Sequence, residues 1–391
     1  MAGDVRNRIT DDVMTVFLCG DVMTGRGINQ ILRYPGDPEL HEPYVKDARY
    51  YWQLAGRAHG PIPRPVNDEY IWGDAIEEWN RRAPDVRIVN LETAVTSSNS
   101  FWKGKEIHYR MSPNNIGCLL TAKIDCCALA NNHVLDWGYE GLEETLRSLQ
   151  RAGMRTAGAG RNSVAAQFPA ILDVGPKRRV LVFSFGSETS GIPRAWSADD
   201  SRPGVNLLPN LSDATIKRIR ANITSHRRAG DVVVASVHWG RNWGYMIPFE
   251  QRRFAHQVID LAEVDVVHGH SSHHVKGIEV YRNRLILYGC GDFLTDYEGI
   301  SGYEEFRGDL ALMYFASFDA SSGRLVGLRM TPLQVQRMRL TRPSAPDVTW
   351  LEKVLNRECE RLGTRVRLTE DGSFALHWDL KCDLAAATGV P

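Results

Sequence analysis

The chain has 391 residues, 43% hydrophobic and 24% charged, which is the composition of an ordinary globular protein. Its 47 basic and 47 acidic residues give a net charge of zero, so no general attraction to nucleic acid or to an anionic membrane is expected. No apolar stretch reaches the roughly 18–20 residues that span a bilayer, and the polar residues 1–6 lack the apolar core of a signal peptide. These features predict a cytoplasmic protein with no membrane segment and no nucleic-acid partner.

Apolar runs and turn residues predict alternating strands and helices along most of the chain. Strands are expected at residues 13–19, 86–91, 124–130, 180–185, 232–237, 264–267 and 285–288, with antiparallel strand-rich segments at 310–318 and 325–340. Helices are expected at residues 141–152, 211–229, 249–262 and 350–362. The alternation indicates α/β layers, and the late run of strands favours two packed sheets over one doubly wound sheet.

Two further segments bear on this organisation. Residues 28–80 are rich in proline and aromatic residues and read as an inserted excursion with short helices. A long excursion of this kind is either a functional lid or a packed surface subdomain, and the sequence leaves both open. The seven cysteines show no CxxC spacing, and the adjacent pair Cys126 and Cys127 lies in an apolar run, so buried free thiols are expected.

The most informative stretch is residues 266–274, where an apolar run ends in a dense group of histidines. Four of the chain's 12 histidines fall within seven residues there: His268, His270, His273 and His274. Neutral imidazole is the commonest metal ligand, and open α/β sheets place their sites at the carboxyl ends of strands. We expect His270 and His273 to face the site and the two flanking histidines to face away.

Other predicted strands end in the same way, with residues able to bind a metal. These residues are Asp21, Glu92, Asn132 with His133, and His238. Each alone has a structural explanation, since Asp closes turns and Asn caps helices. Together, mixed oxygen and imidazole ligands suit Zn, Mn, Fe, Co or Ni better than Ca. They exceed what one tetrahedral zinc needs, so we expect two divalent cations, with Mn, Zn and Fe the leading identities.

Two such cations lower the pKa of a shared water and supply hydroxide near neutral pH. Glu92 is placed to bridge the ions, and His133 to protonate a leaving group. The competing interpretation of His133 is a buried histidine hydrogen-bonded to Asp136. Asp292 is a candidate partner that orients a histidine. Arginines near the site loops would bind an anionic substrate, although surface positions are the usual alternative for them: Arg26, Arg110, Arg161 and Arg241.

As a set, these motifs resemble the CapA family of bacterial poly-gamma-glutamate capsule biosynthesis proteins. They are Gly-Asp-Val-Met at 20–23, Asn-Leu-Glu at 90–92, Ala-Asn-Asn-His at 130–133, His-Trp-Gly at 238–240 and Gly-His-x-x-His at 269–273. The resemblance implies the calcineurin-like metallophosphoesterase fold, a two-sheet αββα sandwich with a two-metal site. It implies metal-ligand roles for the strand-end residues and an acid role for His133. The family-like domain would span residues 13–340, with the insertion at 28–80, and a helical extension would occupy residues 341–391.

The chain departs from the family pattern at several positions. Met23 stands where metallophosphoesterases usually have the histidine of Asp-x-His, so one metal position is expected to be weak or differently completed. Ser271 and Ser272 replace the usual His-Pro, and Asp292 replaces the asparagine of Gly-Asn-Phe. Capsule-producing members are typically tethered to a membrane, and no tether is visible here.

Three functions remain from the sequence. The first is a metal-dependent hydrolase acting on an anionic phosphoester or a gamma-glutamyl-type amide, on a small or polymeric substrate. The second is a non-catalytic accessory metal-binding protein of poly-gamma-glutamate or capsule biosynthesis. The third, an amide-forming enzyme, is disfavoured because no nucleotide-binding loop is visible. The sequence does not set the oligomeric state.

Overall fold

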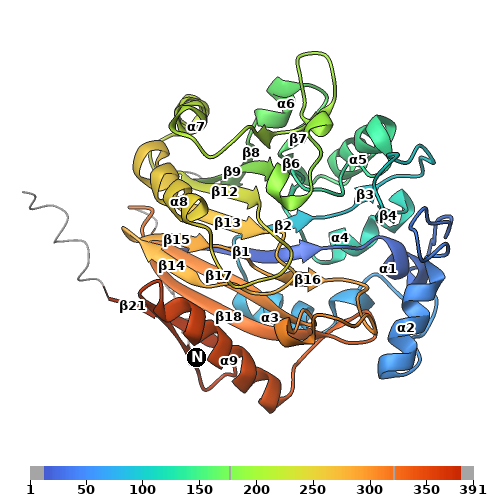
Figure 1. Cartoon of the computed structure of the whole chain (residues 1–391). Coiled ribbons are helices and arrows are strands. Elements are labelled where there is room, and N and C mark those ends of the chain that lie inside the picture. Colours follow the sequence, from blue (N-terminus) through green and yellow to red (C-terminus); the bar gives the residue numbers. More distant parts are fainter. Residues whose placement is uncertain (1–12, 176–177, 320–321, 380–391) are drawn as a thin grey trace, which may run out of the picture.

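The computed structural model describes residues 13–175, 178–319 and 322–379. Residues 1–6, on which the signal-peptide prediction rests, lie outside these ranges, as does the end of the 341–391 extension. Within them, strands and helices alternate along the chain and form several sheets, so the predicted α/β class is confirmed (Figure 1).

Two large sheets organise the described part of the chain. The ten-stranded sheet has the order β20 (Thr364–Leu368), β21 (Phe374–Trp378), β18 (Leu325–Val335), β17 (Leu310–Asp319), β1 (Val13–Val22), β2 (Val86–Leu91), β5 (Cys126–Ala128) and β6 (Arg155–Ala157), with β16 (Asp292–Leu294) on β1 and β19 (Leu340–Thr341) on β18. The seven-stranded sheet has the order β11 (Leu207–Leu208), β9 (Arg178–Ser187), β12 (Val232–His238), β13 (Val266–His270), β15 (Arg284–Leu287) and β14 (Ile278–Tyr281), with β8 (Ala170–Val174) on β9. Two small pairs are β3 (Ala94–Val95) with β4 (Arg110–Met111), and β7 (Ala159–Gly160) with β10 (Gly204–Val205).

The two large sheets share one apolar core. Val16 and Ile88 of the ten-stranded sheet and Val182 and Val234 of the seven-stranded sheet belong to the same buried cluster. Helix α9 (Ala345–Glu360) adds side chains such as Leu355 to this cluster. Because alternate strand residues point to opposite faces, these side chains fill the space between the sheets while their neighbours pack outward.

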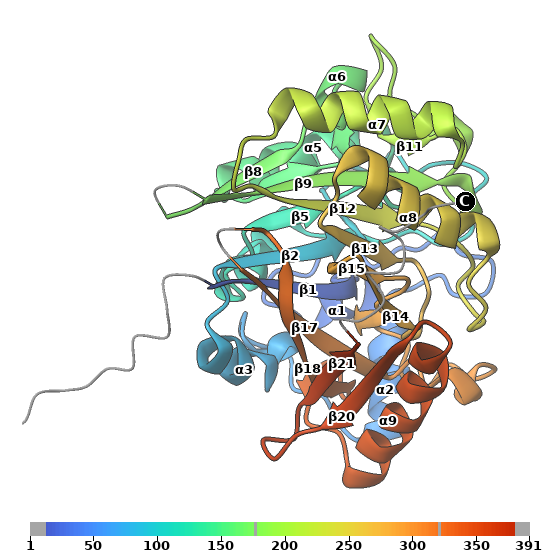
Figure 2. The ribbon, with the colours of Figure 1, turned by 90° about the vertical axis from the view of Figure 1, so that its left-hand side faces the viewer.

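Helices cover the outer faces of both sheets (Figure 2). Helices α7 (Asp213–His226) and α8 (Phe249–Ala262) pack on the seven-stranded sheet. The outer cluster of the ten-stranded sheet includes side chains from α2 (Arg49–His59), α3 (Ala75–Arg82), α4 (Gly117–Thr121) and α5 (Gly138–Arg151). The remaining α-helices in the described ranges are α1 (Arg26–Ile31) and α6 (Ser163–Gln167).

The proline-rich excursion at residues 28–80 is packed against the ten-stranded sheet. Tyr51, Trp72 and Trp79 are buried in the same cluster as Phe17 of β1. The Val66 amide donates to the Ile31 carbonyl, which closes the base of the excursion. The segment is therefore held against this sheet by buried aromatic side chains.

The predicted strand at 86–91 and the predicted helix at 249–262 have the same bounds as β2 and α8. In the two large sheets, the strands that were not predicted are β6, β8, β11, β14, β16, β20 and β21, and the two small pairs were not predicted either. Strands β20 and β21 form a hairpin beside β18 that continues the sheet after α9. Cys126 and Cys127 are buried and free, as expected.

Candidate metal centre

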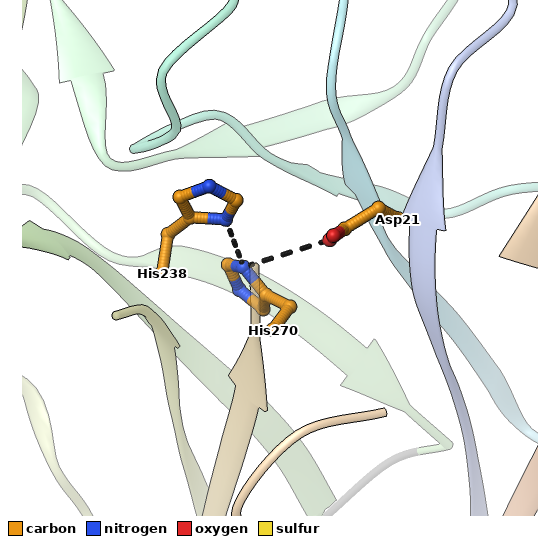
Figure 3. Close-up of side chains that lie close together, drawn as sticks. All are labelled: Asp21, His238 and His270. Carbon is orange, nitrogen blue, oxygen red and sulfur yellow. Dashed lines mark hydrogen bonds and ion pairs between the residues drawn. The ribbon is translucent and has the colours of Figure 1, made fainter. Parts of the chain in front are cut away.

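The carboxyl ends of strands from both sheets meet at one place. Asp21 lies near the end of β1, and His238 and His270 are the last residues of β12 and β13. Strands β12 and β13 are parallel, with His238 directly opposite His270. Asp21, from the other sheet, faces this pair across the gap (Figure 3). The structure thus brings together strand-end residues that are more than 200 positions apart in the sequence.

Asp21, His238 and His270 form a first group able to hold a cation. One ligand atom from each lies within 4.8 Å of the others. His238 Nδ1 is 2.8 Å from His270 Nδ1, and His270 Nδ1 is 4.0 Å from Asp21 Oδ1. All three residues are buried, so the group is shielded from bulk water.

A second group shares Asp21 and adds His273 and Asp292, again with ligand atoms within 4.8 Å of one another. His273 Nδ1 lies 2.8 Å from Asp292 Oδ1, which is the orienting contact expected for Asp292. All three side chains are buried. Asp21 is thus common to both groups, whereas the sequence analysis above expected Glu92 to be the bridging carboxylate.

A strained turn at Ser271 lies between His270 and His273 and sets their positions. Ser271 has φ of 94°, a conformation that residues with a side chain rarely adopt. Its amide donates to Asp21 Oδ2 at 3.2 Å. Backbone strain of this kind gathers at functional sites and persists only where its surroundings enforce it. The turn replaces the His-Pro of the family pattern and still presents His270 and His273 to the same aspartate.

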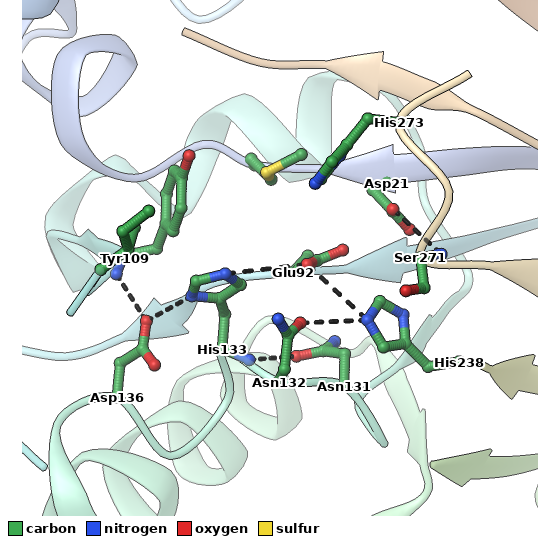
Figure 4. Close-up of polar contacts among 12 residues, drawn as sticks. Asp21, Glu92, Tyr109, Asn131, Asn132, His133, Asp136, His238, Ser271 and His273 are labelled. Carbon is green, nitrogen blue, oxygen red and sulfur yellow. Dashed lines mark hydrogen bonds and ion pairs between the residues drawn. The ribbon is translucent and has the colours of Figure 1, made fainter. Parts of the chain in front are cut away.

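Glu92 and Asn132 lie beside the first group (Figure 4). Asn132 Oδ1 is 3.0 Å from His238 Nε2, and Glu92 Oε1 is 3.8 Å from the same nitrogen. The Asn90 amide group donates to Asp21 Oδ1 at 2.7 Å and to Glu92 Oε2 at 3.2 Å. Asn90, the first residue of the Asn-Leu-Glu motif and one for which no role was predicted, therefore holds the two carboxylates in place.

His133 lies next to Glu92 on the side away from the strand-end histidines (Figure 4). Its Nε2 is 3.8 Å from Glu92 Oε1, and its Nδ1 is 2.6 Å from Asp136 Oδ2. The Tyr109 amide also donates to Asp136 Oδ2, at 2.6 Å. Lys105 Nζ lies 2.9 Å from His133 Nδ1 and forms an ion pair with Asp136. Lys105 was missed because it lies in an irregular loop with no motif around it.

Burial controls the protonation of the histidines. It lowers the pKa of His238 and His270 well below the ordinary value, and neighbouring imidazoles lower it further. Burial also lowers the pKa of His133, to about 4, against the opposing effect of Asp136. At His273 burial again acts to lower the pKa, but the Asp292 carboxylate outweighs it and the net shift is upward. His238 and His270 are thus held as the neutral imidazoles that bind metals.

The carboxylates show the opposite effect. Burial, followed by the nearby Asp292 carboxylate, raises the pKa of Asp21 to about 7. Burial and the charge of Asp21 raise the pKa of Glu92 well above its usual range. Buried carboxylates this close repel one another unless a cation neutralises them. The donor set, whose buried carboxyl groups tend to hold protons unless a cation replaces them, therefore fits divalent cations.

The four predicted substrate arginines occupy different environments. The Arg26 guanidinium donates to Asp296 at 3.1 and 2.6 Å and to Glu42 at 2.9 Å, and is buried. Arg110 donates to two backbone carbonyls and a side-chain amide, and stacks 3.8 Å over the Trp137 ring. Two others are exposed on the surface: Arg161 and Arg241. Arg26 and Arg110 line the same small pocket, and neither Arg161 nor Arg241 lines it.

His268 and His274 lie outside the candidate groups, although the centre of the His268 ring is 5.2 Å from that of His270. His268 Nε2 is 2.7 Å from the Cys19 carbonyl oxygen, and its Nδ1 is 3.1 Å from Ser236 Oγ. The same Ser236 Oγ is 2.8 Å from His270 Nε2. His274 accepts from the Gly244 amide at 3.1 Å. Ser236 was missed because a serine within an apolar strand carries no signal of its own.

The fold and the site together define an α/β protein with a candidate metal centre at the strand ends of two sheets. Residues 15–297 match the family described as bacterial capsule synthesis protein PGA_cap, and the chain belongs to that family. The resemblance drawn from the motifs is thereby confirmed.

Two relatives illustrate the range of similarity within the family. The chain is 46% identical over 356 residues to a probable polyglutamine synthesis accessory protein of Mycobacterium tuberculosis (strain ATCC 25618 / H37Rv), covering 91% of this chain and 93% of that protein. It is 25% identical over 368 residues to the PGA biosynthesis protein CapA of Bacillus subtilis (strain 168), covering 94% and 80% respectively. None of the helices in the described ranges combines the length and apolarity needed to cross a bilayer.

Proposed function

We propose that this protein is a metal-dependent hydrolase acting on an anionic phosphoester or a gamma-glutamyl-type amide. The observation that carries the proposal is the pair of buried ligand groups sharing Asp21, one with His238 and His270 and one with His273 and Asp292. In this proposal the two sheets form the metallophosphoesterase-type sandwich. The catalytic domain spans residues 13–340, and residues 341–391 extend it.

Each residue has a distinct role in the proposal. Asp21, Glu92, Asn132, His238, His270 and His273 hold two divalent cations, of which Mn, Zn and Fe suit the mixed oxygen and nitrogen donors. Bound cations would supply Lewis-acid activation of water and of the scissile group. Exposed Arg161 and Arg241 are the better placed of the predicted arginines to meet an anionic substrate, since internal acceptors already bind Arg26 and Arg110.

His133 is the proposed general acid, with Asp136 as its partner. A carboxylate only accepts hydrogen bonds, so the 2.6 Å contact with Asp136 Oδ2 places a proton on His133 Nδ1. With its pKa lowered to about 4, the ring is neutral in the metal-free protein, so the acid role requires that Nε2, on the side where Glu92 lies, takes up a second proton before passing one to a leaving oxygen or nitrogen. The Tyr109 amide and Lys105 hold Asp136 in position for this step.

A second candidate function is an accessory, non-catalytic metal-binding role in polyglutamate or capsule synthesis. It is favoured by the similarity to the mycobacterial protein, whose name describes an accessory function. The His133–Asp136 pair beside the ligand groups argues for catalysis, because a purely structural metal site needs no acid.

The deciding experiment measures metal content and turnover on the same purified protein. We expect about two divalent ions per chain, with Mn- or Zn-dependent hydrolysis of p-nitrophenyl phosphate or of gamma-glutamyl p-nitroanilide. Turnover of one substrate and not the other would identify the class of bond. Two bound ions with neither activity would support the accessory role, and absence of bound metal would refute both proposals.

A further inference from the structure

Met23 leaves one cation position short of a ligand. It occupies the place where the sequence pattern of metallophosphoesterases has a histidine. Its thioether is buried, and Tyr297 Oη donates a hydrogen bond to Met23 Sδ at 3.6 Å. A thioether is a soft ligand, poorly matched to the cations that carboxylate and imidazole donors favour. If a second cation binds near Asp21 and His273, another residue must complete its ligand set.

Asp292 is brought to that position by the backbone. Strand β16 pairs in parallel with β1, with Asp292 directly opposite Asp21. The Asp21 amide donates to the Gly291 carbonyl at 3.0 Å. This close approach depends on Gly20, since a Cβ there would lie 1.6 Å from the same carbonyl oxygen. The two aspartates therefore start from adjacent backbone positions at the edge of the site.

The two oxygens of Asp292 have different surroundings. Oδ1 contacts His273 Nδ1 at 2.8 Å. Oδ2 is buried and has no hydrogen-bond partner among the described residues, although the side chain as a whole is only 1% exposed. A buried carboxylate oxygen without a partner is costly, and native proteins seldom leave one. Beside Asp21 and His273, an oxygen of this kind is well placed to act as a metal ligand.

We propose that Asp292 is itself a metal ligand, completing through Oδ2 the cation position that Asp21 and His273 begin and that Met23 cannot supply. The inference rests on the proposed function, because it assumes that divalent cations occupy the site. It assigns Asp292 more than the orienting role. One oxygen fixes the His273 ring, and the other binds the ion.

The rival explanation is that Asp292 only orients His273. Losing such an outer partner lowers metal affinity by about 10–100-fold. Losing a charged direct ligand should cost more, so affinity at one of the two positions is expected to fall by more than about 100-fold in Asp292→Asn. Asparagine keeps the shape and still accepts from His273 Nδ1. The matched control is Asp265→Asn, a buried carboxylate paired with Arg284 just before the opposite end of β13.

Calorimetric titration of the metal-free proteins with Mn²⁺ tests the proposal. We expect two binding events in the wild type and in Asp265→Asn, and the loss of one event in Asp292→Asn. If the wild type binds two ions and Asp292→Asn binds them equally well, or with a loss within the 10–100-fold range, Asp292 is not a ligand and the metal centre still stands. A wild type that binds no Mn²⁺ would overturn the proposed function and this inference with it.

A second variant tests directly whether the side chain at position 292 is bonded to the metal ion. In Asp292→Cys loaded with Co²⁺, a thiolate bonded to the ion gives an intense near-ultraviolet charge-transfer band that a merely nearby thiol does not produce. Wild-type protein loaded with Co²⁺ is the control for the native buried thiols Cys19 and Cys290. We expect the band only in the variant. A variant that binds two cobalt ions without the band would refute the direct bond.

Discussion

Arg26 should act as a structural tie whose loss destabilises the fold. Its guanidinium donates to Asp296, which follows β16, and to Glu42 in the 28–80 excursion. The side chains are almost fully buried, at 2% exposure for Arg26, 5% for Glu42 and 0% for Asp296. Tyr51 contributes its hydroxyl at 3.0 Å and its ring at 3.7 Å. The network therefore connects the excursion to the edge of the site.

Replacing Arg26 with methionine keeps much of the side-chain volume and removes the charge. Asp296 and Glu42 would remain buried without their partner, and breaking a buried pair in this way costs about 3–5 kcal/mol. We expect that loss in the free energy of unfolding, measured by urea titration of tryptophan fluorescence. Arg26→Lys should recover only part of it, since an ammonium group cannot reproduce the two-point contact with Asp296.

Arg241→Met is the control, because an exposed arginine should change stability by no more than about 0.5 kcal/mol. A loss below about 1 kcal/mol in Arg26→Met would refute the structural role. If such a variant also showed a raised KM with unchanged kcat, Arg26 would instead be the substrate contact that the sequence suggested.

Three further predictions concern the metal centre. His238→Ala and His270→Ala should each reduce bound metal in elemental analysis, whereas His256→Ala, outside the ligand groups, should not; equal metal content in all three would remove the ligand assignment. His133→Ala should keep its metal but lose about 10²–10⁴-fold in turnover of a substrate with a poor leaving group, and retained turnover would make His133 structural. The pKa of Asp21 is raised to about 7, so between pH 4 and pH 7 its carboxyl group keeps a proton in the folded protein that the unfolded chain has released. The free energy of unfolding of the metal-free protein should therefore fall as the pH rises from 4 to 7. Urea midpoints across that range check this, and a slope that is unchanged in Asp21→Asn would assign the effect to other groups.

The central strands were predictable because strands buried on both faces are near-continuous apolar runs, as in β12. Strand β20 was missed although its sequence, Thr-Arg-Val-Arg-Leu, alternates apolar and polar residues as an exposed edge strand does. Its burial alternates at first in the same way, with Thr364 and Val366 inside. The signal was present but short, and a five-residue run gives little periodicity to recognise.

The candidate ligands were predictable for a different reason. Parallel strands deliver their carboxyl ends to one edge, so His238 and His270 could be placed together without knowing any contact. The pairing of Arg26 with Asp296 could not, because the partners are 270 positions apart and neither lies in a motif. Lys105 presents the same difficulty, since its contact with His133 depends on the path of an irregular loop. Local sequence patterns predict individual helices and strands, whereas buried ion pairs depend on how those helices and strands pack together.

The packing of the two sheets also determines which nitrogen of His270 is free to bind a cation. The Cys19 carbonyl of β1 can only accept, so the neutral His268 ring donates to it through Nε2–H, and His268 Nδ1 is left as an acceptor. Ser236 therefore donates its hydroxyl hydrogen to His268 Nδ1, and its oxygen accepts from His270 Nε2–H. That leaves His270 Nδ1 with its lone pair directed toward His238 and Asp21. A contact between the sheets thus leaves one nitrogen of His270 unprotonated at the candidate metal centre, as a ligand nitrogen must be.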